Sequence, residues 1–489
     1  MGSLTINLRE FEPVGKHIPE ESPVMGQLCQ LLGAEPDTCI DRFCREVQTR
    51  LEQASAKDLL VLNPTAASPT LFSRLGSVWW TQGFVGVLQF SLPWKHHPER
   101  EPQPVTLNIR SRFDREEDAS FLLYVFEKTC GAGGTLYDRM RISGNSAGTW
   151  DLLLASAFVR QLHDAMNRGF LRQYREREYN DNCLRGRIDV ARHLRENPLF
   201  SGKTAYTSRE YTADNPVNTL ILRAFDRLDR EHHLLLRSLI AKDDVVRQGI
   251  QTLKAEIPDW QRESDAAVIR KADRRIVQNV YRSYEPLRKT AIAVLRRVGI
   301  DAFLQGDSTV SGLLIDMPDL WEKFLYNTVL KPYTGAQGPY RQQKYGILGG
   351  RRYAEPDFLL KEQGIVLDAK YKVHWANTLT DGDWGALRDD TYQLISYALI
   401  FDCTFCGVIF PVPADSEVRE APEELIAPIS DACQDRFFVR IPYRIPQVTE
   451  DGGSYRAAFE ASNRAVMERL RELETRVRAG SSRQAAHGD

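Results

Sequence analysis

Residues 354–372 of the chain read AEPDFLLKEQGIVLDAKYK. Two short apolar runs, FLL and IVL, stand here between charged residues and a glycine-containing turn. Short β-branched and aromatic runs bounded by turn residues are typical of strands. The pattern predicts two β-strands, over 356–360 and 365–370, joined by the turn KEQG.

The charged residues of this hairpin have a predictable geometry. Side chains alternate between the faces of a strand, so Asp368 and Lys370 project from the same face. Asp357 begins the preceding strand and meets Asp368 across the open end of the hairpin. Two converging carboxylates repel each other unless a cation neutralises them, and oxygen ligands favour Mg²⁺ or Mn²⁺. A metal there would polarise a phosphodiester, while Lys370 orients or deprotonates the attacking water.

This is the P-D…D-x-K arrangement of metal-dependent nucleases, although the motif alone is weak evidence. An exposed hairpin with a Lys–Asp pair on an edge strand would have the same residues. Two flanking segments favour the nuclease. DMPDLWEKFLYNTVL, over 316–330, predicts a helix with Glu322 near its start, and RDDTYQLISYALIF, over 388–401, predicts a helix with Gln393 and Tyr397 four residues apart. This order of elements is similar to that of RecB-like nucleases in the PD-(D/E)xK superfamily.

The sequence therefore predicts a set of catalytic residues: Asp357, Asp368, Lys370, Glu322 and Gln393. Asp357, Asp368 and Glu322 are the predicted metal ligands. Asp319-x-x-Glu322 also fits a capping box, a structural role for Glu322 that is compatible with metal binding. Gln393 would position the DNA strand or a water, or else form a hydrogen bond within the helix layer.

Basic residues gather in two places. The first lies between Glu322 and Asp357, where tyrosines are interleaved and no acid occurs between Lys331 and Glu355; its predicted DNA contacts are Arg341, Lys344, Arg351 and Arg352. A solvated basic surface is the alternative. The second is LRGRIDVARHLREN, over 184–197, where interleaved acids make internal ion pairs or a protein interface as plausible as DNA.

Length and periodicity predict a multidomain α+β protein, because 489 residues exceed one ordinary core. Strand-like runs such as TINLREFE and VTLNIRSRF predict a β-rich N-terminal domain over 1–145. Helical spacing of apolar residues predicts a helical middle region over 146–300. An α/β pattern predicts a PD-(D/E)xK nuclease domain over 301–450, followed over 451–489 by a C-terminal helix (455–479) and a disordered tail.

Several features exclude other classes of protein. The net charge of -2 makes any nucleic-acid surface a local matter. No apolar run approaches the roughly 20 residues of a membrane helix, and no signal pattern opens the chain. A cytoplasmic protein that does not associate with a membrane is therefore expected. SGKT at 201–204 lacks the first glycine of a P-loop, so no nucleotide hydrolysis is assigned. Cys403-x-x-Cys406 has no second ligand pair, which favours two buried thiols over zinc.

The chain resembles the McrC family, the nuclease subunits of McrBC modification-dependent restriction systems. The resemblance is carried by LTINLREFEPV, VGVLQFSLP…VTLNIRSRF, LRGRIDVARHL…GKT…YTADNPVNTLILRAF, LWEKFLYN, EPDFLL…IVLDAKYK and YQLISYALIF…GVIFPVP. It implies an endonuclease for anti-phage defence that cuts double-stranded, modified DNA while docked on a McrB-like AAA+ GTPase hexamer whose activity it stimulates. The GTP then belongs to the partner, and the 1–145 domain is the expected docking region.

Two other functions compete with this hypothesis. The first is a catalytically silent activator or scaffold of an AAA+ ring; an eroded site would indicate it, and here every acidic and basic position is present. The second is a stand-alone RecB-like repair nuclease, against which the large non-nuclease part of the chain argues.

Overall fold

The structure is a computed structural model that describes residues 3–53, 59–62, 69–114, 120–130, 146–199, 202–241, 243–296, 311–335, 340–341, 343–376, 381–414, 426–447 and 452–486. Two compact units make up the chain. Unit 1 comprises Met1–Ala54, Val61–Thr149 and Asp307–Asp489, and unit 2 comprises Ser55–Leu60 and Trp150–Gly306. The predicted multidomain α+β class is confirmed. Segments of the predicted N-terminal domain and of the predicted nuclease domain both belong to unit 1.

One sheet has five strands in the order β1-β6-β5-β10-β2; its strands belong to unit 1, except that the boundary with unit 2 falls within β2. Their bounds are Leu4–Arg9 (β1), Leu59–Leu62 (β2), Phe84–Leu92 (β5), Gln103–Arg110 (β6) and Ser311–Asp316 (β10). The strands predicted in TINLREFE and VTLNIRSRF are confirmed as β1 and β6, which pair in parallel. β10 comes from far along the chain and pairs antiparallel with β5.

The same part of the chain also forms the helices α1 (Val14–His17), α2 (Pro23–Leu32), α3 (Pro36–Gln53) and α4 (Ser120–Cys130), and a hairpin of β3 (Phe72–Leu75) and β4 (Val78–Thr81). The prediction of a β-rich domain for this segment did not include the helices α2 and α3. The start of α2 carries a recognisable signal, since the Ser22 hydroxyl accepts a hydrogen bond from the Met25 N–H and Pro23 occupies the first helical position.

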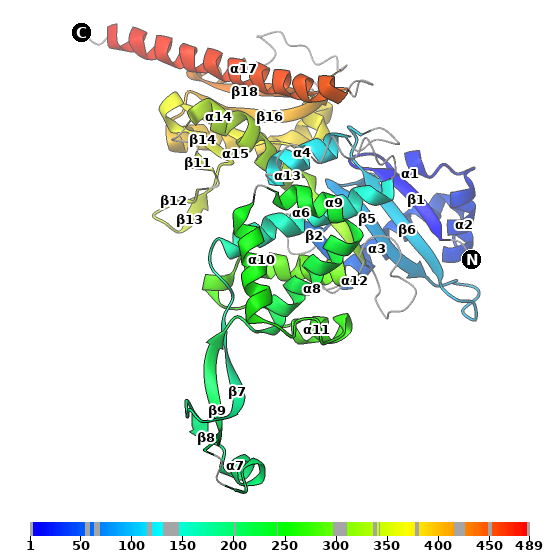
Figure 1. The fold of residues 1–489 in the computed structure, drawn as a ribbon. Helices are drawn as coiled ribbons and strands as arrows, with labels where there is room; N and C mark the ends of the chain where they lie inside the picture. Colours follow the sequence, from blue (N-terminus) through cyan, green and yellow to red (C-terminus); the bar gives the residue numbers. More distant parts are fainter. Residues whose placement is uncertain are drawn as a thin grey trace. The chain divides into compact units, whose positions relative to one another are not determined.

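The second sheet of unit 1 has six strands in the order β11-β14-β15-β16-β18-β17 (Figure 1). Their bounds are Tyr340–Arg341 (β11), Phe358–Leu360 (β14), Ile365–Ala369 (β15), Phe405–Pro413 (β16), Ile426–Ser430 (β17) and Cys433–Ile445 (β18). β15, β16 and β18 are parallel. The sequence of β16, FCGVIFPVP, is almost continuously apolar, as expected for a central parallel strand that is buried on both faces. A separate hairpin, β12 (Tyr345–Ile347) with β13 (Arg352–Ala354), extends from the β14 side of this sheet.

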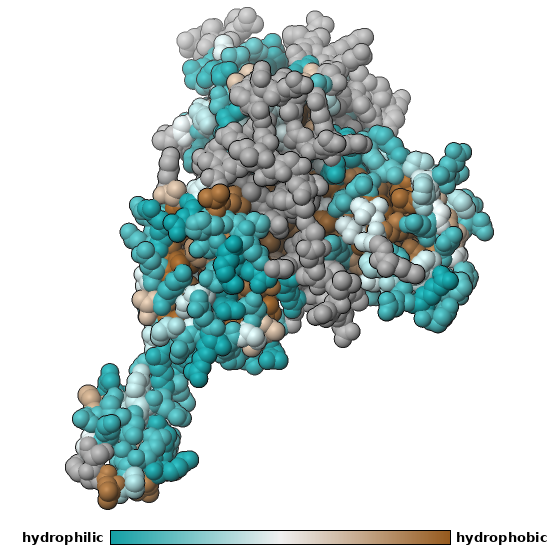
Figure 2. All heavy atoms as spheres, turned by 45° about the vertical axis from the view of Figure 1, so that its right-hand side comes forward, coloured by the Kyte–Doolittle hydropathy of each residue, from teal (hydrophilic) through white to brown (hydrophobic). Residues whose placement is uncertain are grey.

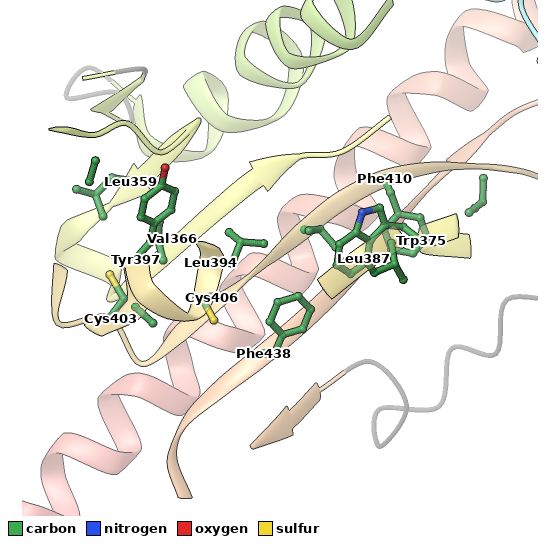
Figure 3. Packing of buried hydrophobic residues seen from close by; sticks show 14 residues of the cluster. Leu359, Val366, Trp375, Leu387, Leu394, Tyr397, Cys403, Cys406, Phe410 and Phe438 are labelled. Carbon is green, nitrogen blue, oxygen red and sulfur yellow. The ribbon is translucent and has the colours of Figure 1, made fainter. Parts of the chain in front are cut away.

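Helices cover this second sheet. Leu387, Leu394 and Ala398 of α15 (Asp381–Phe401) pack with Val366, Cys406 and Phe410 of the sheet in one hydrophobic cluster (Figure 3). On α17 (Gly452–Ala486), Asn463 accepts a hydrogen bond from Tyr443 of β18 at 2.8 Å. This helix runs past the predicted end at residue 479. Cys403 and Cys406 are free and buried, as predicted.

Besides α15 and α17, a further helical stretch belongs to this part of unit 1. It begins with α13 (Met317–Leu325), continues as a π-helical turn (Tyr326–Leu330) and ends with α14 (Lys331–Thr334). Its apolar residues Leu320, Trp321, Phe324 and Leu325 are buried, as the sequence predicted. The Trp321 ring stacks on Phe324 and meets Tyr443 of β18 edge-on, so α13 is held against the sheet that carries the predicted site.

Unit 2 contains α6 (Ser146–Met166) from Trp150 onward, α8 (Pro216–Glu231), α9 (His233–Ile240), α10 (Asp244–Glu256), α11 (Asp265–Lys271) and α12 (Tyr284–Arg296). α8 begins at Asn215, whose side chain accepts hydrogen bonds from the N–H groups of Val217 and Asn218. The asparagines of the DNPVN element thus have a structural role. Among the described residues no helix is both long and apolar enough to cross a membrane.

An arm interrupts the helices of unit 2. It consists of β7 (Gln173–Asp181), β8 (Arg187–Ile188), α7 (Val190–Glu196) and β9 (Thr204–Thr212), with β7 and β9 paired along their whole length. Figure 1 shows it extending away from the helices, with α7 at its far end. The helical middle region predicted over 146–300 does not continue through 173–181, because α6 ends at Met166, Gly169 adopts a φ of 100° and the charged run QYREREYND forms β7 instead.

Candidate active site

The predicted hairpin is confirmed, and it brings two acids together. β14 and β15 pair antiparallel with Phe358 opposite Leu367, so Asp357 lies across from Asp368 just beyond the last pair. The Asp357 N–H donates to Asp368 Oδ1 at 3.3 Å, and the Ala369 N–H donates to Asp357 Oδ2 at 2.8 Å. The turn closes at Gly364, whose φ of 65° suits glycine. Backbone donors therefore orient both carboxylates.

Lys370 lies beside Asp368, which confirms that the two side chains share one face of β15. Its Nζ is 3.1 Å from Asp368 Oδ2 and 3.3 Å from Asp390 Oδ1 of α15. The backbone N–H of Lys370 donates to Ile409 O of β16 at 3.0 Å. The ammonium group is therefore fixed both by the sheet and by two carboxylates.

Glu322 is buried on α13. It is close enough to Asp357 for its charge to raise the pKa of that carboxyl group. The capping-box alternative is wrong, because the N-cap of α13 is Asp316, whose Oδ1 accepts from the Asp319 N–H at 3.4 Å. The structure thus brings Glu322 towards the Asp357–Asp368 pair.

The electrostatics of the cluster depend on its burial. Burial, together with the charges of Asp368 and Glu322, raises the pKa of Asp357 well above its ordinary value. Burial alone would lower the pKa of Lys370, but Asp368, Asp390 and Asp357 outweigh it and raise that pKa to about 12. Lys370 is therefore a cation at neutral pH, which favours its role as a charge-stabilising and orienting group over that of a general base.

The donor set fits a divalent ion with two protein carboxylates. Within the described residues, no three His, Cys, Asp or Glu side chains form a ready-made metal cage. The predicted three-carboxylate set is therefore not preformed. Mg²⁺ is commonly held by only one or two carboxylates together with waters and substrate phosphates. Asp357 and Asp368 meet that requirement, and the raised pKa of Asp357 marks a place where added positive charge is favourable.

Gln393 and Tyr397 lie on one face of α15, as predicted. The Gln393 amide donates to the Tyr397 hydroxyl at 2.8 Å, which is the hydrogen bond of the alternative interpretation. Apart from this hydrogen bond the Gln393 side chain is exposed to solvent, while Tyr397 is buried in the hydrophobic cluster between α15 and the sheet. A contact of Gln393 with DNA or water stays a prediction.

The predicted DNA contacts occupy the segment before Asp357. β11 places the backbone of Arg341 opposite Phe358. Lys344 Nζ is 3.7 Å from Glu355, while Arg351 and Arg352 are exposed on the β12–β13 hairpin. DNA binding by these residues stays a prediction.

Sequence reasoning missed Asp390, which pairs with Lys370 and also lies 2.6 Å from Lys372 Nζ. A signal was available, because Asp390 precedes Gln393 by three residues and therefore lies on the same side of the predicted helix.

A buried junction next to Lys370 was also missed. The hydroxyls of Tyr371 and Ser111 both donate to Glu10 Oε1, at 2.7 Å each, and Arg112 Nη2 donates to Tyr371 O at 2.8 Å. Burial raises the pKa of Glu10, and the Arg112 charge and these hydrogen bonds oppose that rise. The junction fixes the residue that follows Lys370 to the ends of β1 and β6.

The family described as "McrBC 5-methylcytosine restriction system component" matches residues 81–411. Among curated proteins, none matches the sequence. A chain from the refined half-complex of a tetradecameric assembly of Thermococcus gammatolerans McrB AAA+ hexamers with bound McrC is 15% identical, with a TM-score of 0.42 over 94% of this chain and 100% of its own. A chain from the cryo-EM structure of the Thermococcus gammatolerans McrBC complex is 14% identical, with a TM-score of 0.29 over 69% and 89% of the two chains.

Proposed function

Because the chain belongs to the family of McrBC 5-methylcytosine restriction system components, we propose that it is the metal-dependent DNA endonuclease subunit of such a system. In this proposal it cuts double-stranded DNA while docked on a partner AAA+ GTPase, whose hydrolysis of GTP it stimulates. The single observation that carries the nuclease activity is the meeting of Asp357 and Asp368 at the open end of one hairpin, with Lys370 beside them.

Each residue of the cluster has a distinct task. Asp357 and Asp368 would hold Mg²⁺ or Mn²⁺, with Glu322 close by to bind a ligand water. When bound, the ion supplies positive charge that polarises the phosphodiester and eases deprotonation of water. Lys370, a cation at neutral pH, orients the attacking water and offsets the negative charge that builds up on the phosphate. Asp390 holds Lys370 in place from α15.

The composition of the arm of unit 2 favours a role in binding a partner protein. Arg185 pairs with Asp181 at 3.2 Å, and Arg192 donates to Tyr206 O at 2.7 Å, so two of the four arginines over 184–197 serve internal contacts. Figure 2 shows a mostly hydrophilic arm with a few apolar side chains at its far end. The exposed apolar residues of this segment are Leu184, Ile188, Val190, Leu194 and Leu199. An exposed apolar group favours a protein interface over a DNA-binding surface, and we assign it to the AAA+ partner.

The test compares plasmid cleavage by the full chain, with its partner, GTP and Mg²⁺, for wild type, Asp368→Ala and Lys370→Ala. Each variant should cut roughly 100-fold more slowly or worse, because one charged group at the scissile phosphate is lost. Asp402→Ala is the matched control, because Asp402 is an acid of the same unit that is 91% exposed in its ion pair with Arg436. Chelation of the metal should stop cutting, and Mg²⁺ should restore it.

The same experiment separates the competing functions. Full cutting by both site variants would remove the catalytic assignment. Stimulation of the partner GTPase without cutting by the wild type would instead identify a silent activator, and degradation of linear DNA without the partner would identify a stand-alone nuclease.

A further inference from the structure

The tip of the β12–β13 hairpin carries an exposed leucine in an unfavourable backbone conformation. Leu348, Gly349, Gly350 and Arg351 join the two strands, and the first three have φ values of 51°, 66° and 80°. Positive φ is ordinary for glycine and uncommon for leucine. The Leu348 side chain is 76% exposed, so it gains no packing inside the unit in return. An outlier of this kind at an exposed tip points to a contact outside the chain.

The base of the hairpin is anchored. Tyr345 and Ile347 pack against the hydrophobic cluster that contains Ala354, and the Tyr345 ring centroid is 4.8 Å from that of Phe401 on α15. Ala354 is followed after two residues by Asp357. At about 3.3 Å per residue, the nine steps from Leu348 to Asp357 span at most about 30 Å. The tip and the paired acids can therefore contact one stretch of duplex about nine base pairs long.

The positive charge of the hairpin favours DNA as the molecule that its tip contacts. Arg351 and Arg352 follow the tip directly, both are exposed, and no acid pairs with either one in the described part of the chain. Two free guanidinium groups beside one apolar side chain suit a DNA groove, in which arginines bind phosphates and an apolar wedge enters between base pairs.

We propose that Leu348 inserts into the minor groove of the bound duplex and partly unstacks one base step, while Arg351 and Arg352 bind the flanking phosphates. The inference rests on the proposed function and deepens it: the hairpin grips and deforms DNA beside the site of cutting. Because unstacking costs least free energy at flexible pyrimidine–purine steps, Leu348 should insert preferentially at those steps.

The test uses the full chain with Asp368→Ala in complex with its AAA+ partner and GTP, so that DNA binding is measured without cleavage. Short duplexes carrying 2-aminopurine at successive positions report unstacking as a rise in fluorescence, and anisotropy reports affinity. Adding Leu348→Ala should abolish most of the fluorescence rise and change the affinity little. Adding Arg351→Gln and Arg352→Gln should weaken binding roughly 10-fold and lower the salt dependence of log K by about one per arginine.

The matched control is Leu234→Ala, since Leu234 is 77% exposed and lies on α9 of unit 2; it should leave both readouts unchanged. A fluorescence rise that persists in Leu348→Ala overturns the wedge. Loss of GTPase stimulation by Leu348→Ala, with no change in DNA binding, also overturns it and makes the tip a protein contact. If the complex of the Asp368→Ala chain with its partner binds no duplex, the proposed function fails and the wedge fails with it.

Discussion

Asp357 is half-buried beside the two buried acids Glu322 and Asp368, and this environment disfavours its ionised form. Burial and the charges of Asp368 and Glu322 raise its pKa, while the Ala369 N–H and Lys370 oppose the rise. A carboxyl group whose pKa is raised on folding contributes stability that is complete below its unfolded pKa of about 3.9 and is lost as the pH rises through the folded value. The metal-free protein is therefore destabilised by this group at neutral pH.

Asp357→Asn should remove that destabilisation. Without metal, the variant should melt at a higher temperature than the wild type at about pH 7.5, and the two should converge towards about pH 4. Mg²⁺ should raise the melting temperature of the wild type more than that of the variant, because the variant lacks one ligand charge. A lower melting temperature of metal-free Asp357→Asn at neutral pH would contradict this account; Asp402→Asn, at an exposed carboxylate, is the control.

At the scale of elements, the arm is built differently from the rest of unit 2. β7 reads QYREREYND and is largely exposed, so pairing with β9 rather than an apolar face holds it. Ion pairs brace its sides: Arg175 and Arg177 each reach Asp214 at 2.7 Å. α7 has no buried residue and presents apolar side chains at the far end. Because α7 packs against little else, its apolar side chains are available to bind a partner protein.

Leu194→Ser should weaken the action of the chain on its GTPase partner. Leu194 is exposed on α7, so the fold should survive, and the concentration of the chain needed for half-maximal stimulation should rise roughly 10-fold. The GTPase rate is measured against chain concentration. Val280→Ser, at another exposed apolar residue of unit 2 outside the arm, should behave as wild type. Equal stimulation by Leu194→Ser would remove the arm from the interface.

At the scale of the whole chain, contacts between distant residues hold the candidate active site. Glu10 follows β1 and Tyr371 follows β15, yet they share a buried hydrogen bond of 2.7 Å. The Arg112 guanidinium lies 4.6 Å from the centre of the Tyr371 ring and adds a cation–π contact. The first sheet of unit 1 is thereby tied to the residue next to Lys370.

Tyr371→Phe should lower the free energy of unfolding by about 1–3 kcal/mol, because a buried carboxylate loses a donor. Combined with Glu10→Gln, the two changes should be clearly non-additive, since the residues are in direct contact. Urea unfolding of the four proteins measures the coupling. Tyr353→Phe, at an exposed tyrosine of the same unit, should change stability by no more than about 0.5 kcal/mol. Strictly additive effects would show that the junction is not a coupled unit.

What the sequence could specify was local. The apolar runs FLL and IVL define two strands, and the alternation of a strand then places Asp368 and Lys370 on one face. Spacing of three and four residues marks α13 and α15 and aligns Gln393 with Tyr397. Helix starts were also legible, as Ser22-Pro23 of the missed α2 illustrates. These features depend only on neighbours in the chain, whose geometry the backbone fixes.

The tertiary structure decided which distant segments meet. No local pattern tells that β10 completes the sheet of β1, β5 and β6, or that Glu10 is buried against Tyr371. The convergence of Glu322 and Asp390 on the hairpin depends on how α13 and α15 pack against the sheet. The charged strands of the arm have no apolar face to reveal them. Such contacts arise from burial and pairing across the fold, which periodicity along the chain does not encode.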